Sequence, residues 1–542
     1  MNKYIIITVV ISFLGLISCN DDFMERYPKD KINDETYWHT ESDLKNFANQ
    51  FYTTLDNMDV YSVDDNSDNQ ANRSKNSFSW NEYTIPSSGD GWGKSDWSNI
   101  RNCNYFLSRY HTVNGQQSII NQYVGEVYFF KAKFYYEKVL RYGDVPWLTE
   151  DLTTSSKELQ EKRDDRSIVM DSICACLDNA IKWLPEDMRE SRLSKYAALA
   201  LKSRACLFEG TWRKYRNLDQ SEKFLKRSIE ASEAIINSGK FELYQTGDVK
   251  EDYHALFNQQ DYTDNKEAIF FVSYITDKRM NNRPRSAREA GTGMTKDFVE
   301  SFLCKDGLPI ELSSLYKGDA KFMDEFENRD PRLKQCVYTP DRPIAILPDG
   351  SKEYENSPVF NNMTFTGYRL YKLYSPLSED NEYIKCTLDD LVYRYGEVLL
   401  NYAEAKAELG ECDQTVLDKT INKLRDRVAM PHMNVNIDFI DPNWPDWEVG
   451  VSPLINEIRR ERRVELACEG LRWNDLCRWK AGKLLENVKS YLGARDPETG
   501  EYRILYSGMT RVWNDRLYLY PIPTDELTYN PNLKPQNPGW EN

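Results

Sequence analysis

Pairs of amphipathic helices joined by tight turns limit the fold of this chain more than any other sequence feature. In residues 388–410 and 417–428, apolar residues recur every three or four positions, which is the spacing of one buried helix face. The pattern returns at residues 194–238, where Ser194 can cap the first helix and Gly239 follows the second. The sequence therefore predicts two antiparallel helix pairs.

Two further regions extend this pattern. Residues 95–112 are expected to pair with residues 117–140, and residues 454–480 have the periodicity of one long helix. Helix pairs with a period of ~34 residues are typical of tetratricopeptide-like stacking. We therefore expect a mainly α-helical scaffold.

Polar, irregular stretches separate the helices. Residues 62–94 are rich in Ser, Asn, Asp and Gly, and residues 277–296 and 340–366 are equally irregular. Loops of this length are usually functional or disordered. Short β-like runs occur at residues 267–274, 367–374 and 516–523. These runs are too few for a dominant sheet.

The N-terminus carries the pattern of an export signal that ends in a cysteine. The apolar run from Tyr4 to Leu16 is shorter than the ~20 residues that cross a bilayer. Small residues then precede Cys19, so we predict that residues 1–18 are removed, that Cys19 is lipidated, and that residues 19–36 form a tether. Each buried methylene of such lipids contributes about 0.8 kcal/mol to membrane binding. The alternative is a buried helix in which Cys19 falls by chance.

Charge and metal-binding residue types exclude several classes of function. Without residues 1–18 the chain has 69 basic residues, because Lys3 is lost, and 86 acidic residues, a net charge of −17. Such a field repels nucleic acid and anionic lipid, so the lipid must hold the chain at a membrane. The four histidines form no metal motif and the cysteines no CxxC pair, so we expect no metal and no cofactor. The ten cysteines other than Cys19 are expected to be mostly small buried hydrophobes.

A series of short motifs resembles the SusD-like (RagB/SusD) nutrient-binding outer-membrane lipoproteins. Each motif alone is weak, but eight of them follow one another in the family order. They are FMERYPKDKINDETYW after Cys19, WSNIRNCNYFL (97–107), GEVYFFKAKFYYEKVLRYGDVPW (125–147), LSKYAALALKSRACLFEGTWRKY (193–215), NRDPRL (328–333), YRYGEVLLNYAEAKAELG (393–410), ERRVELACEGLRWNDLCRWKAG (461–482), and the closing YLYPIP with QNPGW.

This resemblance implies a SusD-like domain over residues 37–542. Its scaffold of tetratricopeptide-like helix pairs would lie mainly in residues 37–61, 95–240 and 387–480, and an irregular ligand-binding half mainly in residues 62–94, 241–386 and 481–542. The resemblance also implies a TonB-dependent, SusC-like transporter as partner, with the lipoprotein lying over it and facing the cell exterior. Many members of the family bind oligosaccharides, and some bind peptides.

Two sets of glutamates raise the alternative of a surface glycoside hydrolase. Such an enzyme needs two carboxyl groups ~5–9.5 Å apart, which one helical turn can supply. The sets are Glu461, Glu465 and Glu469, and Glu397, Glu404 and Glu408. Arg459, Arg460, Arg462, Arg463 and Arg472 lie near the first set, so ion pairs within and between helices are the favoured explanation. We therefore expect that the protein is not an enzyme.

The candidate ligand-binding residues lie in two of the irregular loops. Trp80, Tyr83 and Trp92 fall where no periodic face would bury them, and a flat ring can stack on a sugar, although packing within the loop is equally compatible. Arg279, Arg283 and Arg285 share a second loop and could bind hydroxyls, carboxylated sugars or a peptide terminus, unless that loop is simply solvated.

Together these features predict a binding protein that captures an oligosaccharide and delivers it to a transporter. The alternatives are a surface glycoside hydrolase, a peptide-binding member of the same family, and a tetratricopeptide-like scaffold that binds only proteins.

Overall fold

The computed structural model describes residues 37–55, 59–187, 191–289, 291–361, 363–443, 445 and 450–541. Cys19 and the predicted signal and tether lie outside the described residues. Of the helices in the described part of the chain, none has both the length and the apolar character needed to cross a membrane.

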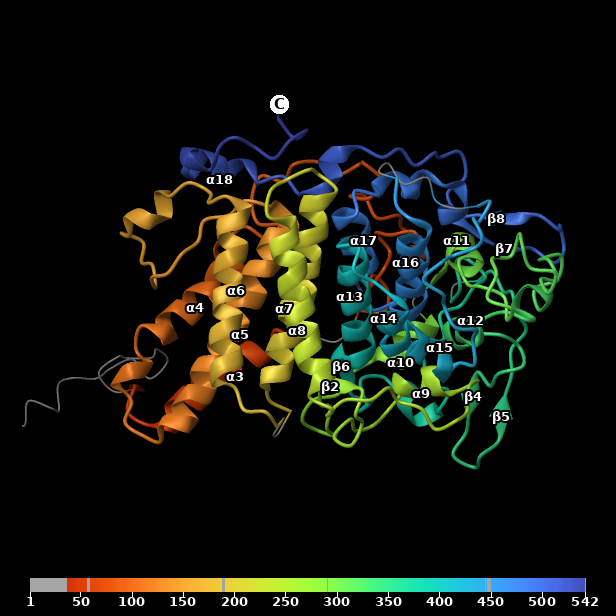
Figure 1. Cartoon of the computed structure of the whole chain (residues 1–542), viewed down its shortest axis with the longest axis horizontal. Helices are drawn as coiled ribbons and strands as arrows, with labels where there is room; N and C mark the ends of the chain where they lie inside the picture. Colours follow the sequence, from red (N-terminus) through yellow and green to blue (C-terminus); the bar gives the residue numbers. More distant parts are fainter. Residues whose placement is uncertain are drawn as a thin grey trace, which may run out of the picture.

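Long antiparallel helices form one side of the molecule, where Figure 1 shows them standing side by side. They are α3 (Glu41–Tyr52), α4 (Ser98–Leu107), α5 (Gln117–Tyr142), α6 (Arg166–Trp183), α7 (Lys195–Lys214) and α8 (Ser221–Asn237). Asp165 caps α6 by accepting a hydrogen bond from the backbone N–H of Ser167. The helix pairs predicted at residues 95–140 and 194–238 are therefore confirmed.

A second group of helices lies beside them in the middle of the molecule (Figure 1). It comprises α13 (Tyr395–Glu408), α14 (Gln414–Lys419), α15 (Ile421–Arg427), α16 (Pro453–Glu465) and α17 (Arg472–Arg478). Two expectations fail here. The helix expected from Leu388 begins only after a short strand, and the single helix expected at residues 454–480 is broken in two. The break occurs where Cys468 and Gly470 adopt left-handed backbone angles, with φ of 58° and 73°.

Within the described residues, short strands form four separate two-stranded antiparallel sheets. The pairs are β1 (Gln70–Asn72) with β3 (Thr292–Met294), β2 (Ala268–Val272) with β6 (Asp390–Arg394), β4 (Ala345–Ile346) with β5 (Lys352–Glu353), and β7 (Leu492–Arg495) with β8 (Tyr502–Ile504). The β-like run at 267–274 is confirmed by β2. The runs at 367–374 and 516–523 are not strands, since the first forms only an isolated bridge at Leu370 and the second begins as a 3-10 turn.

Short helices complete the irregular half. They are α9 (Asp252–Leu256), α10 (Arg283–Glu289), α11 (Lys296–Glu300), α12 (Pro331–Cys336) and, near the C-terminus, α18 (Thr524–Tyr529). The expectation of an irregular loop at 277–296 is thus wrong, because the segment contains α10 and β3.

Besides three small apolar clusters, the described residues form two large apolar cores. The larger lies among the long helices, and the smaller lies under the irregular half. Helix α16 joins them, since its Ile458 belongs to the first core and its Val464 to the second. The protein is mostly helical with a few short strands, so the predicted fold class is confirmed.

The C-terminal segment packs against the N-terminal third of the chain. The ring of Tyr520 stacks on Phe78 with centroids 3.6 Å apart and planes 3° apart. Asn537 donates a hydrogen bond of 3.0 Å from Nδ2 to the carbonyl of Tyr142, at the end of α5. The two ends of the domain therefore stabilise each other.

Candidate functional site

Two of the three predicted loop aromatics lie in the interior. Trp80 is 7% exposed and meets the rings of Tyr491 and Tyr506 edge to face, with the Tyr506 centroid 4.9 Å away. Trp92 is 4% exposed and packs edge to face on Tyr142. The expectation that these rings face solvent is wrong, because segments distant in sequence cover them.

The third aromatic, Tyr83, is half-buried. Its hydroxyl donates a hydrogen bond to Asp90, and its ring packs edge to face on Phe78 and Tyr520. Burial, together with the neighbouring Asp90 carboxylate, raises the pKa of the Tyr83 hydroxyl well above its ordinary value. Tyr83 is therefore neutral and positions the loop.

The three predicted arginines point to different partners. Arg283 is buried and pairs with Asp390, Nη1 to Oδ1 at 2.7 Å. Arg279 donates to the carbonyl of Leu55 at 2.6 Å. Arg285 pairs with Glu289 within α10, and its guanidinium carbon lies 5.8 Å from the exposed ring of Tyr383. Of the three, Arg283 has a structural role.

The two loops named in the sequence do come together, through their backbones. β1 pairs with β3 in the register Gln70 to Met294 and Asn72 to Thr292. The side chain of Gln70 also donates a hydrogen bond of 2.6 Å from Nε2 to the hydroxyl of Thr292. This pairing brings Arg73, the residue that follows β1, next to Asn361, at a part of the surface that was not predicted from the sequence.

Three partly exposed rings form that surface. Phe365 and Tyr506 are in contact with ring centroids 5.7 Å apart, and Tyr506 also packs edge to face on the buried ring of Trp80. Phe360 lies nearby on the backbone of Gly367, where an added Cβ would come within 2.7 Å of the Phe360 ring. Gly367 has a φ of 83°, so both its backbone angle and this close approach require glycine.

Basic side chains surround these rings. Arg503 lies 5.5 Å from the centroid of Phe360, Arg73 donates a hydrogen bond of 2.8 Å to the carbonyl of Asn361, and Lys75 contacts the sulfur of Met509. We call the set Arg73, Lys75, Phe360, Phe365, Arg503 and Tyr506 the aromatic surface. Flat rings beside long cationic donors can stack on a sugar ring and bind its hydroxyls.

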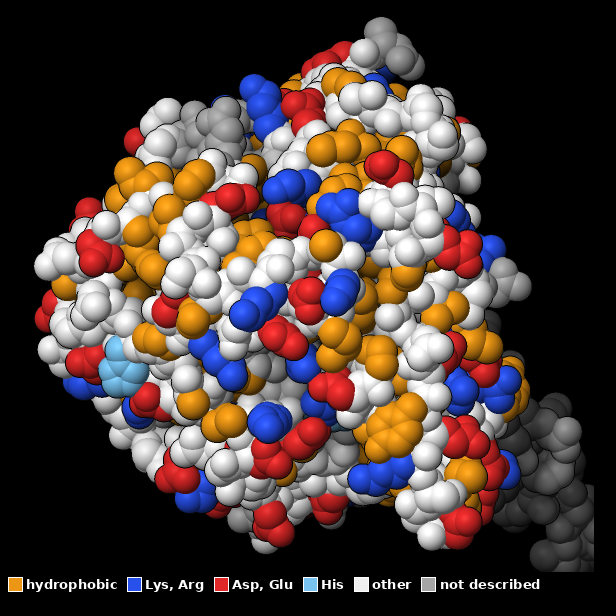
Figure 2. All heavy atoms as spheres, turned by 90° about the vertical axis from the view of Figure 1, so that its right-hand side faces the viewer, with side chains coloured by type: hydrophobic (Ala, Val, Ile, Leu, Met, Phe, Trp, Pro, Cys, Tyr) orange, Lys and Arg blue, Asp and Glu red, His pale blue; other side chains and the backbone are white. Residues whose placement is uncertain are grey.

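The aromatic surface belongs to the end of the molecule where β7 and β8 lie. Figure 2 shows this end, on which hydrophobic side chains alternate with basic and acidic ones. Its residues come from the predicted loops 62–94 and 340–366 and from the C-terminal region. Of the two loops chosen from the sequence, residues 62–94 contribute Arg73 and Lys75 to this surface, and residues 277–296 contribute none of its side chains. The three rings come from other segments and were missed, because sequence alone does not show which segment covers another.

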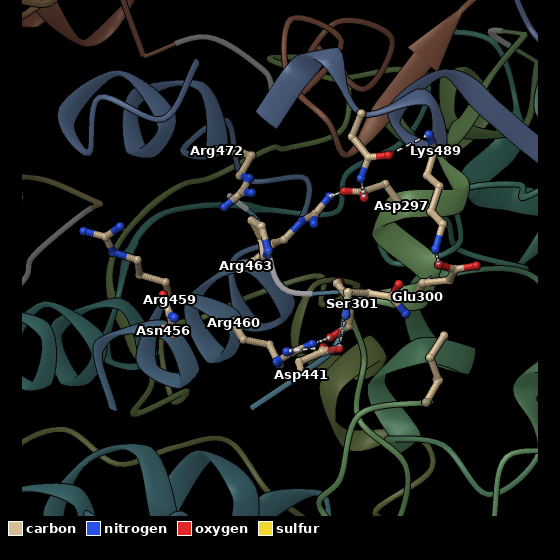
Figure 3. A pocket seen from close by; sticks show the side chains of 14 residues that line it. Asp297, Glu300, Ser301, Asp441, Asn456, Arg459, Arg460, Arg463, Arg472 and Lys489 are labelled. Atoms are coloured by element: carbon tan, nitrogen blue, oxygen red, sulfur yellow. Dashed lines mark hydrogen bonds and ion pairs between the residues drawn. The ribbon is translucent and has the colours of Figure 1, made fainter. Parts of the chain in front are cut away.

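A cavity of about 200 Å³ lies between α16 and α11 (Figure 3). Arg460 and Arg463 of α16 line one side, and Asp297 of α11 with Lys489 lines the other. Arg463 contacts Asp297 at 2.7 Å, Nη2 to Oδ2, and Arg460 contacts Asp441 at the same distance. Burial raises the pKa of Asp297 in spite of Arg463. Because these basic groups already have carboxylate partners, the cavity suits neutral hydroxyls better than a strong anion.

The glutamates considered for catalysis are buried in ion pairs. Glu461 contacts Arg332 at 2.6 Å and Arg425 at 2.9 Å, and Glu404 contacts Arg478. These glutamates are ion-paired as predicted, but the two arginines that pair with Glu461 come from other helices and are not among the five named from the sequence. Burial acts to raise the pKa of Glu461, but Arg332 and Arg425 bring it below its ordinary value. A glycosidase acid requires a raised pKa, so this arrangement does not suit the role.

Comparisons with known families match both parts of the chain. A model described as the SusD family matches residues 254–540. A second model, described as "Starch-binding associating with outer membrane", matches residues 22–207. Together the two matches span most of the described structure.

Individual relatives cover the chain almost completely. A SusD-like protein of Formosa agariphila is 24% identical over 578 residues, covering 100% of both chains. A SusD-like protein of Bacteroides fragilis has a solved structure with a TM-score of 0.75 and 26% identity, covering 95% of this chain and 100% of that one. The structure of a SusD-like carbohydrate-binding protein of the same species has a TM-score of 0.72 and 23% identity, covering 92% of this chain and 100% of that one. These structures share the fold described above.

Proposed function

The chain belongs to the SusD family, and from this premise we propose that it is a cell-surface lipoprotein that captures an oligosaccharide and delivers it to a TonB-dependent outer-membrane transporter. The family description that matches residues 22–207, starch binding in association with the outer membrane, supports the ligand class and the location.

The observation that carries this proposal is the aromatic surface. Stacking on Phe360, Phe365 and Tyr506 would supply apolar contact, while Arg73 and Arg503 would donate to hydroxyls. No chemistry on the ligand is needed for this role. The ion-paired state of Glu461 and Glu404 argues against the alternative of a glycoside hydrolase.

Binding is tested first with oligosaccharides of defined linkage, starch fragments included, by isothermal titration calorimetry. Truncating a central ring, as in Phe360→Ala, should cost about 2 kcal/mol of binding free energy, roughly a 30-fold loss of affinity. Tyr529→Ala is the matched control, because Tyr529 is 71% exposed and lies on α18, far from β7 and β8 in Figure 1. Equal affinity in both variants would mean that the ligand binds elsewhere.

A peptide panel tests the alternative within the family. If the protein binds a peptide and no glycan, and Phe360→Ala abolishes that binding, the ligand is a peptide and not an oligosaccharide. Cleavage of a glycan that Glu461→Gln abolishes would favour the hydrolase.

The anchor and the partner are tested separately. Cys19→Ala should release the protein from membranes or stall its processing, because the lipid alone would hold this acidic chain there. Fractionation of that variant with the outer membrane would contradict lipid anchoring. The delivery step predicts that the detergent-solubilised protein co-purifies with a TonB-dependent transporter, and purification without one would count against it.

A further inference from the structure

Two buried thiols face each other across the contact between α6 and α7. The sulfurs of Cys174 on α6 and Cys206 on α7 are 3.5 Å apart. Their residues are 1% and 0% exposed. A disulfide has an S–S distance of ~2.05 Å, so the two sulfurs need to approach by only about 1.5 Å.

Ion pairs on both sides of the thiols fix the register of the two helices. Lys202 of α7 and Asp178 of α6 meet at 2.6 Å, Nζ to Oδ1, one helical turn from the thiols on each helix. Arg166 and Glu209 meet at 2.6 Å toward the other end. Cys174 and Cys206 are therefore held opposite each other by contacts that do not involve sulfur.

The second cysteine of α6 has different surroundings. Burial raises the pKa of the Cys176 thiol to about 11, although the nearby charge of Lys131 on α5 acts to lower it. The pKa of Cys174 is instead lowered, because its sulfur shares a hydrogen bond with the Cys206 thiol. Of these two cysteines, Cys174 is the one with a thiol partner across the α6–α7 contact.

We propose that Cys174 and Cys206 form an intramolecular disulfide that ties α6 to α7 when the exported chain matures in an oxidising compartment. The Cys174 thiolate attacks one sulfur of a disulfide oxidant and releases one thiolate. The Cys206 thiolate then attacks the Cys174 sulfur of the mixed disulfide and releases the second. Two protons leave the protein, and the oxidant takes up two electrons. Because both thiols are buried, the exchange takes place before the two helices close or during a local opening.

The disulfide would stabilise the helical scaffold mainly by restricting the unfolded chain. It would leave the aromatic surface unchanged, since Phe360, Phe365 and Tyr506 lie outside both helices. Its test is therefore independent of any glycan.

The test uses the full chain, refolded from urea in a mixture of reduced and oxidised glutathione. Remaining thiols are alkylated under denaturing conditions, and the digest is searched for linked peptides by mass spectrometry. We expect a peptide pair joining Cys174 to Cys206, and a higher urea midpoint that dithiothreitol reverses. Cys206→Ser should lack both the link and the shift, while Cys103→Ser, a buried cysteine of α4, should keep both.

Two results would overturn the proposal. One is a folded, oxidant-treated protein in which Cys174 and Cys206 are both fully alkylated. The other is linkage of Cys174 to several cysteines without preference for Cys206. If Cys206→Ser does not fold, the reversible midpoint shift and the peptide map of the unmodified sequence decide the question.

Discussion

Replacing Glu465 by glutamine should destabilise the protein strongly, because this carboxylate is the centre of a buried ion network. It is 0% exposed and accepts hydrogen bonds from Arg427 at 2.6 and 2.7 Å, from Arg394 at 2.8 Å and from Arg332 at 2.9 Å. Glutamine has nearly the same shape, but it keeps only one acceptor oxygen and turns an N–H₂ group toward guanidinium donors.

The magnitude follows from what each arginine retains. Arg332 keeps Asp330 at 2.7 Å, and Arg394 and Arg427 keep Glu267 at 2.9 and 3.3 Å. No arginine is left entirely without a carboxylate. The loss should therefore lie at the lower end of that of breaking a buried pair, about 3 kcal/mol of unfolding free energy.

Urea denaturation at pH 7, followed by circular dichroism, measures this loss by linear extrapolation. Glu222→Gln is the control, because Glu222 forms an exposed pair with Lys226 and should leave the urea midpoint almost unchanged. Burial acts to raise the pKa of Glu465, but its arginine neighbours hold it well below the ordinary value. The stability it supplies is then present above about pH 4.3, the unfolded pKa, and shrinks as pH falls toward the folded pKa. The difference from Glu465→Gln should thus be smaller at pH 3.3 than at pH 7 by about 1.4 kcal/mol. A loss below about 1 kcal/mol at pH 7 would refute this account of the network.

Three further predictions concern other parts of the fold. Trp80→Ala should lower the free energy of unfolding, measured by urea denaturation, by about 3–5 kcal/mol, because it removes a buried ring beneath the aromatic surface. A midpoint equal to that of the unmodified protein would show that the ring is not packed there. Burial lowers the pKa of His254 to about 3, so the native state cannot bind the proton that the unfolded state takes up below pH 6.5. Between pH 6.5 and 5, the unfolding free energy of the unmodified protein should fall by about 2 kcal/mol more than that of His254→Gln. Equal losses in the two proteins would contradict this. Gly482→Ala should lower the free energy of unfolding by about 1–3 kcal/mol, because its Cβ would overlap the ring of Trp513. Thermal and urea denaturation both measure this loss, and unchanged midpoints would mean that the ring can move aside.

The helices of the scaffold could be predicted from sequence because their apolar period is local information. α7 begins directly after Ser194, although the predicted side-chain cap is not formed, and α8 ends two residues before Gly239. The break between α16 and α17 could not be predicted in the same way. Gly470 allows a helix to end but does not require it, and the decision depends on how both halves pack in the two cores.

The candidate site could be predicted only to the level of a segment. Loop 62–94 does reach the aromatic surface, yet Trp80 lies beneath it because Tyr491 and Tyr506 cover its ring. Burial of this kind depends on residues about 400 positions later in the chain, which no periodicity records. The same limit applies to Glu461, whose ion pairs were expected but whose partners Arg332 and Arg425 are far from it in sequence.

The packing of Tyr520 on Phe78 joins two parts of the chain that are far apart in sequence, and it therefore affects the order in which the domain folds. Tyr520 lies more than 400 residues after Phe78, so Phe78 lacks this stacking partner until the end of the chain is in place. Contacts of such long range close late and slow folding. The long helices can pair early, and Trp92 can pack on Tyr142 of α5, but the Phe78 end of the loop gains its stacking partner only with the last residues. A chain that stops before Tyr520 would keep the long helices and lose the ring that covers Phe78.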